Sequence, residues 1–147
     1  MLFVDSAAVE SSLGTTDMNR MGGVGAKMPW TGTTTGIAML SAAGIPPFSG
    51  FWSKLLIVVA LYRSSHEGYA TLAVVASVLT LGYFLVMQQK AFFGKPSANV
   101  EGAKEAGFGY IVPAVALALI TILTGVFFPL LKDGPLAFLL LNKGLTW

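Results

Sequence analysis

The chain has 147 residues, of which 54% are hydrophobic and 11% are charged, and its mean hydropathy is +0.72. Soluble domains carry about 25% charged residues, so this composition indicates an integral membrane protein and excludes an ordinary soluble domain. The absence of cysteine and the single histidine, His66, exclude disulfides, iron–sulfur ligation and a histidine metal cluster within the chain. The net charge of +2 is too small to indicate nucleic-acid binding. We therefore expect no cofactor, no metal and no catalytic centre here.

The first part of the chain, residues 1–27, does not look like a complete membrane crossing. Residues 1–13 are apolar or small but carry Asp5 and Glu10, and a crossing takes roughly 20 apolar residues. We expect a partial helix with both acids near water, because burying an unpaired carboxylate is costly. Residues 11–27 are polar and glycine-rich, which predicts a loop with room for one helical turn.

Residues 28–62 form one long apolar stretch in which Lys54 is the single charged side chain. Pro46 and Pro47 precede the lysine and are followed by Gly50. Proline removes a backbone donor and clashes with the preceding turn, so these residues predict an interrupted membrane helix. Non-helical backbone is tolerated in a bilayer where it faces protein or a water-filled cavity. A lysine at such an interruption is typical of an ion or proton site.

A second interpretation is that Lys54 lies near a helix end and extends its ammonium to the lipid headgroups. The length of the apolar stretch argues against it, because residues 31–62 exceed the roughly 20 needed for a straight crossing. Residues 55–62 also supply two more apolar turns beyond the lysine. The pattern favours a functional site over a lipid-facing lysine.

An interrupted helix would also free backbone carbonyls that can hold water, as a proton path or a sodium site needs. Ser49, Ser53 and Thr80 are candidate polar linings for such a path. The alternative is that these hydroxyls bond to their own helix, which is the more common arrangement in membrane helices.

Two further apolar runs predict a second crossing at residues 69–90 and a third at residues 106–131. The tail, residues 132–147, is too short to cross again. We therefore predict one all-α membrane domain with three transmembrane helices, the first broken at Pro46 and Pro47 and preceded by a partial helix.

Lysine and arginine are unevenly divided between the two sides of this topology. Five fall on the side that holds residues 90–105, and three fall on the other side. Cytoplasmic loops are enriched in these residues, so we expect a multi-pass protein of the cell membrane with residues 90–105 in the cytoplasm.

The stretch GIPPFSGFWSK at residues 44–54 closely resembles the signature of antiporter-like subunits. These subunits belong to respiratory complex I, the Mrp sodium/proton antiporters and the membrane-bound energy-converting hydrogenases. Residues 14–29 are similar to the loop that leads into the broken helix of that family. The resemblance extends over roughly residues 1–93, and beyond them it is one of hydropathy alone.

The resemblance implies that Lys54 occupies the position of a family lysine, replaced by glutamate in some members, that passes protons toward the outer face. It implies a part of the ion-translocating membrane arm of a redox-driven proton or sodium pump, a subunit of a membrane-bound oxidoreductase. Full members have many more helices, so the implied partners are other membrane subunits, including one that supplies upstream helices. Asp5 and Glu10 fall where the family usually has small or neutral residues. The alternative is a non-translocating structural subunit, or a split or degenerate remnant, that fills an interface in such a complex.

Overall fold

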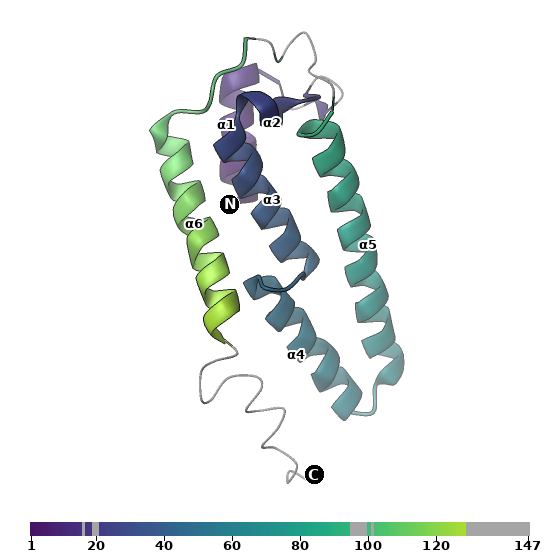
Figure 1. Cartoon of the computed structure of the whole chain (residues 1–147). Helices are drawn as coiled ribbons and strands as arrows, with labels where there is room; N and C mark the ends of the chain where they lie inside the picture. Colours follow the sequence, from purple (N-terminus) through teal and green to yellow (C-terminus); the bar gives the residue numbers. More distant parts are fainter. Residues whose placement is uncertain (16, 19–20, 95–99, 101, 129–147) are drawn as a thin grey trace.

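The computed structural model describes residues 1–15, 17–18, 21–94, 100 and 102–128. These residues form helices and connecting segments without a strand (Figure 1), which confirms the all-α prediction for this part of the chain. The helices are α1 (Leu2–Leu13), α2 (Val24–Lys27), α3 (Pro29–Ala43), α4 (Ser49–Arg63), α5 (Glu67–Ala91) and α6 (Phe108–Phe127). The end of the predicted third crossing and the predicted tail lie outside the described residues.

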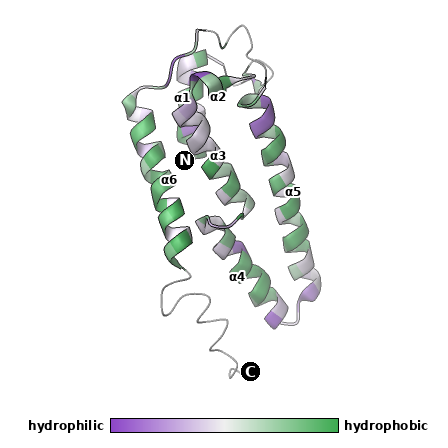
Figure 2. Ribbon diagram, in the orientation of Figure 1, coloured by the Kyte–Doolittle hydropathy of each residue, from purple (hydrophilic) through white to green (hydrophobic). Residues whose placement is uncertain are grey.

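Helices α5 and α6 are the two described helices that are long and apolar enough to cross a membrane. The 25 residues of α5 extend about 37 Å at the rise of an α-helix, against a hydrocarbon core of about 30 Å. Figure 2 shows both helices hydrophobic along most of their length. Large side chains such as Leu79 and Ile120 are exposed on them, at 67% and 58%. Exposed apolar surface of this extent fits helices that face lipid or other membrane helices.

Helices α3 and α4, with 15 residues each, follow one another along the length of α5 (Figure 1). Helix α3 ends at Gly44, which adopts a left-handed conformation with φ of 85° and donates its N–H to the carbonyls of Leu40 and Ser41. Glycine takes this conformation without the strain that a Cβ would add. Pro46 and Pro47, joined by a cis peptide bond, then stand between the two helices. Two short helices thus occupy the length of one long helix, with the prolines at the interruption.

Two glycines allow the backbone to pack closely around this interruption. A Cβ on Gly50 would collide with the carbonyl oxygen of Ser41, so α4 begins in direct contact with the end of α3. A Cβ on Gly125 would collide with the carbonyl oxygen of Pro47, which places α6 against the interruption itself. The indole nitrogen of Trp52 also donates to the carbonyl oxygen of Gly125 at 2.7 Å. Helix α6 therefore supports the broken segment from one side.

A cluster of buried hydrophobic residues lies at the end of the bundle where α3 begins and α5 ends. It joins α1, α2, the end of α5 and the segment before α6, through Ala8, Val9, Met21, Val24, Met28, Ala91, Phe92, Val100, Ala103 and Ala106. Helix α2 is the single turn expected between residues 11 and 27. This cluster fixes α1 against the start of α3.

The expectation that both acids of α1 lie near water is wrong for Asp5, which is 2% exposed, whereas Glu10 is exposed. The reason is that Asp5 is buried with a partner: the Thr34 hydroxyl donates to its Oδ1 atom at 2.9 Å. A hydrogen bond offsets part of the cost of burying a carboxyl group.

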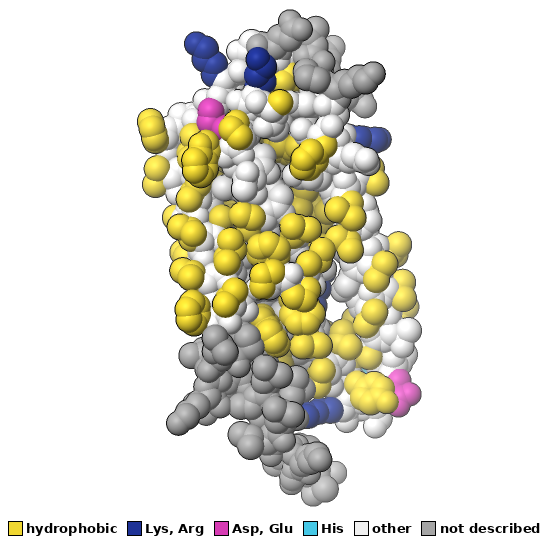
Figure 3. All heavy atoms as spheres, viewed as in Figure 1, with side chains coloured by type: hydrophobic (Ala, Val, Ile, Leu, Met, Phe, Trp, Pro, Cys, Tyr) yellow, Lys and Arg dark blue, Asp and Glu magenta, His cyan; other side chains and the backbone are white. Residues whose placement is uncertain are grey.

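Hydrophobic side chains cover the middle of the face shown in Figure 3, and charged side chains gather toward its two ends. The long axis of the bundle is therefore the direction in which a membrane would be crossed.

Candidate functional site

Lys54 lies in the second turn of α4 and is half-buried. Its Nζ atom donates to the carbonyl oxygen of Ala43, the last residue of α3, at 3.0 Å. The last four carbonyls of a helix lack partners within the helix, and this end carries the negative part of the helix dipole. The ammonium of Lys54 therefore reaches back across the interruption to a strong acceptor.

Gly44 makes room for the stem of this lysine. A Cβ on Gly44 would lie 2.7 Å from Cδ of Lys54, which is too close for two carbon atoms. The glycine is thus required both for the left-handed turn that ends α3 and for the path of the Lys54 side chain.

A cavity of about 270 Å³ lies beside Lys54, between α4 and α5. Lys54 and Ser77 supply its side-chain polar groups, and residues such as Phe51 and Val78 supply apolar walls. The Ser77 hydroxyl donates to the carbonyl of Ala73 at 2.9 Å, which leaves its lone pairs free to accept. A cavity of this size has room for several water molecules, and water needs such polar partners. The arrangement presents a cation to a small space with mostly apolar walls.

The three hydroxyl residues predicted as polar linings lie elsewhere. Ser49 and Ser53 line a different cavity of about 140 Å³ on the side of α4 that faces α6. Their mutual contact runs from the Ser53 hydroxyl to the Ser49 carbonyl, at 3.5 Å. Thr80 donates to the carbonyl of Ala76 at 2.7 Å and does not line either cavity. The structure thus brings Lys54 together with the interruption but not with these three hydroxyls.

Ser77 was not identified from the sequence, although it lines the Lys54 cavity. Helix α5 is apolar on every side, so no periodicity indicates which of its hydroxyls faces α4. Ser77 and Thr80 lie one turn apart on α5, and the packing of α5 against α4 determines that Ser77, and not Thr80, lines the cavity.

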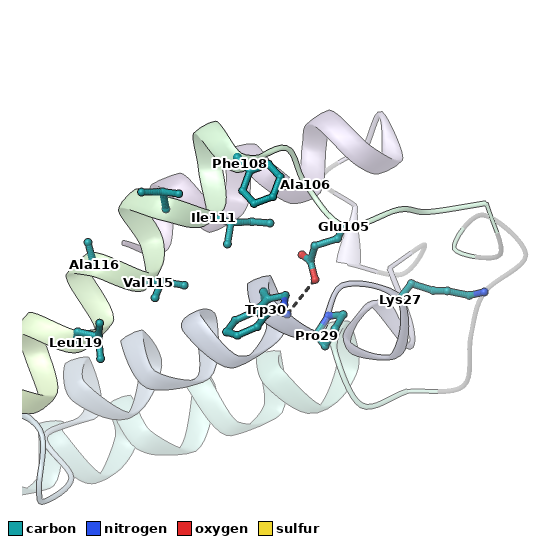
Figure 4. Close-up of a pocket in the computed structure, with 11 residues that line it drawn as sticks. Lys27, Pro29, Trp30, Glu105, Ala106, Phe108, Ile111, Val115, Ala116 and Leu119 are labelled. Atoms are coloured by element: carbon teal, nitrogen blue, oxygen red, sulfur yellow. Dashed lines mark hydrogen bonds between the residues drawn. The ribbon is translucent and has the colours of Figure 1, made fainter.

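Glu105 binds the first turn of α3 from a distant segment (Figure 4). Its carboxylate accepts the Trp30 N–H at 2.9 Å, the Thr31 N–H at 3.3 Å and the Thr31 hydroxyl at 2.7 Å. The first N–H groups of a helix lack partners within the helix and favour a negative charge. The segment before α6 is therefore fastened to the start of the broken helix.

The groove in Figure 4, of about 890 Å³, runs between α3 and α6 beyond this contact. Its wall on α6 is apolar, with Ile111, Val115 and Leu119, and Lys27 points away from it in this view. Within the described ranges, no three His, Asp or Glu side chains come together as a metal site would need.

Comparison with known proteins agrees with this arrangement. Residues 1–80 match the family described as NADH:quinone oxidoreductase/Mrp antiporter, transmembrane. The Na(+)/H(+) antiporter subunit A1 of Staphylococcus haemolyticus is 35% identical over 145 residues, which cover 90% of this chain and 18% of the relative. The NADH-quinone oxidoreductase subunit N 2 of Herpetosiphon aurantiacus is 33% identical over 117 residues, or 80% of this chain and 21% of the relative.

A solved structure of the Mrp complex from Dietzia sp. DQ12-45-1b contains a chain of similar fold. The TM-score is 0.75 at 23% sequence identity, and the match covers 88% of this chain and 32% of that one. This chain spans about a fifth of the length of the two curated relatives described above. The resemblance drawn from residues 44–54 is confirmed. The family description covers more than half of the residues, and the chain is a membrane protein that belongs to the NADH:quinone oxidoreductase/Mrp antiporter transmembrane family.

Proposed function

We propose that the chain is part of the ion-translocating membrane portion of an Mrp-like or complex I-like assembly, in which Lys54 relays protons at the broken helix. The observation that supports this most directly is the bond from Lys54 to the Ala43 carbonyl beside a small cavity. The names of the relatives, Na(+)/H(+) antiporter and NADH-quinone oxidoreductase subunits, point to the same class.

The bond can serve as a switch because it depends on the charge of the lysine. The protonated ammonium is held by the free carbonyl and the negative end of α3. When the ammonium gives a proton to water in the cavity, the neutral amine loses most of this attraction. Lys54 is then free to turn toward the cavity and take up another proton, so a charge change nearby can drive uptake and release.

The wider setting is part of the same proposal. The exposed apolar faces of α5 and α6 would pack against other membrane subunits or further helices, including ones upstream of α1. The assembly would lie in the cell membrane with residues 90–105 in the cytoplasm. A structural subunit without transport remains the alternative that an experiment must separate.

The test is ion transport by membrane vesicles that contain the assembled complex, normalised to the amount of assembled protein. We expect Lys54→Ala to leave assembly intact and to lower proton-coupled flux by about 10²-fold, the usual contribution of a proton-transferring group. Lys54→Arg should retain the bond to Ala43 yet transport poorly, because arginine does not release its proton. Lys54→Glu should retain partial flux, since a carboxylate also binds and releases protons.

Lys90→Ala is the matched control, because Lys90 is an exposed lysine in the last turn of α5. Complexes that carry Lys90→Ala should show the same ion flux as the wild type. Normal flux through assembled Lys54→Ala complex would contradict the relay, and loss of assembly in step with flux would favour the structural alternative.

A further inference from the structure

The contact between α1 and α3 contains an unusual group of buried polar side chains. Among the described residues, the polar side chains that are fully buried are Asp5, Thr31, Thr34 and Thr35, each exposed by 4% or less. The rest of this bundle packs apolar residues, so the group is not explained by general packing. The Lys54 site does not include any of them.

The two carboxyl oxygens of Asp5 have different surroundings. Oδ1 accepts the Thr34 hydroxyl at 2.9 Å, which is the shortest of three contacts that this hydroxyl makes with acceptors. Oδ2 is buried and has no hydrogen-bond partner within the described structure. A buried, unpaired oxygen of an ionised carboxylate is costly. In the neutral acid, Oδ1 is the carbonyl oxygen that accepts the Thr34 hydroxyl, and Oδ2 carries a hydrogen for which water in a neighbouring cavity is a suitable acceptor. The arrangement fits the neutral acid.

A cavity lies beside Asp5. It measures about 350 Å³ and lies between α1, α3 and α5, with Asp5, Ser6 and Thr35 among its lining residues. The remaining walls are apolar and include Met39 and Phe84. The cavity is large enough for water molecules, and its lining includes few polar side chains besides Asp5. A carboxyl in such surroundings favours its uncharged form.

We propose that Asp5 is a second proton-binding group of this chain, held in place by Thr34 and open to the cavity between α1, α3 and α5. Uptake forms an O–H bond at Oδ2 with a proton supplied by hydrated protons in the cavity. Release breaks that bond and returns the proton to cavity water, so no other reactant is needed.

The position of this site relates it to Lys54. Thr34 precedes Ala43 by nine residues of α3, which is roughly 13 Å along the helix. On α5, Ser77 and Leu81 line the Lys54 cavity and Phe84 lines the Asp5 cavity. Spacings of three and four residues keep these side chains on one face of a helix. The two cavities therefore follow one another along α5, and any role of Asp5 in transport rests on the function proposed above, whereas proton binding does not.

The charged groups on neighbouring helices leave Asp5 largely without an ionic partner. Helices α3 and α6 contain no charged residue, and those of α5, Glu67 and Lys90, lie at its exposed ends. On α1, Glu10 is exposed.

The test is infrared difference spectroscopy of the assembled complex in lipid, between low and high pH. We expect the C=O stretch of a protonated carboxyl at low pH, with an isotope shift after labelling with side-chain ¹³C aspartate, and its disappearance at high pH. Asp5→Asn should remove this band, and Glu10→Gln on the same helix should leave it in place. Lys54→Ala should also leave it in place, so the outcome does not depend on transport.

A second variant covers the case in which Asp5→Asn does not assemble. Thr34→Val keeps the shape of the side chain but removes the hydrogen bond to Oδ1, so the band should persist and move to higher frequency. The proposal is overturned if the wild-type complex shows no aspartate band at any pH tested. It is also overturned if the band is unchanged by Asp5→Asn, or if Thr34→Val does not move it.

Discussion

The two short helices α3 and α4 and the continuous helix α5 lie side by side, yet they are stabilised in different ways. In α5, 25 residues form one helix whose backbone groups, apart from those of its two ends, bond within the helix, and many of its apolar side chains are exposed. At the interruption, each freed backbone group needs its own partner. The Ala43 carbonyl accepts Lys54, and the Gly50 N–H donates to the Ser41 hydroxyl at 3.3 Å. A continuous membrane helix therefore depends mainly on composition, whereas an interrupted one depends on individual residues.

The largest contrast should come from adding one methyl group at the start of α4 and one within α5. Gly50→Ala places a Cβ against the Ser41 carbonyl oxygen and should destabilise the assembled protein by about 1–3 kcal/mol, as overpacking does. Gly82→Ala in α5 meets open space and should be neutral or stabilise by about 0.5–1 kcal/mol, because alanine favours a helix. Thermal unfolding in mild detergent measures both. Equal effects at the two positions would mean that the interruption is no more sensitive than α5.

A smaller effect is expected where α6 packs against the interruption between α3 and α4. Trp52→Phe keeps the aromatic ring but removes the hydrogen bond to the Gly125 carbonyl, an acceptor in the last turn of α6. We expect a loss of about 1 kcal/mol in the same unfolding assay. Tyr83→Phe is the control, since Tyr83 is an exposed aromatic on α5. A loss as large in the control would show that the assay responds to aromatic polarity in general.

The smallest effect is expected within α5 itself. The Thr80 hydroxyl bonds to the carbonyl of Ala76 in its own helix, so Thr80→Val should change stability by no more than about 0.5 kcal/mol. Ion flux should be unchanged as well, because Thr80 does not line the Lys54 cavity. A marked loss of flux in this variant would instead support the sequence-based prediction that Thr80 lines the ion path.

The positions of the helices could be predicted from the sequence, but most contacts between the helices could not. Hydropathy predicts a helix over residues 69–90, and α5 spans Glu67–Ala91, because an apolar run of that length has few alternatives in a bilayer. The burial of Asp5 was not predicted, because its hydrogen-bond partner Thr34 lies 29 residues away along the chain. The free-energy cost of burying a carboxyl group depends on whether such a partner is present. The threonines at positions 31, 33, 34 and 35 were the available signal, since so many hydroxyls are unusual in an apolar run. Glu105 was equally hidden, 75 residues from the helix it caps.

The contact of Glu105 with the first turn of α3 has a mechanical consequence. Glu105 holds the start of α3, and the end of α3 is bonded to α4 twice, by Lys54 Nζ at the Ala43 carbonyl and by the Gly50 N–H at the Ser41 hydroxyl. If Lys54 loses its bond, α3 keeps both the Glu105 contact and the Gly50–Ser41 contact, although five residues separate Ala43 from Ser49. The loss of the Lys54 bond would therefore release the lysine side chain while α3 and α4 stay joined, so proton release would not require either helix to move.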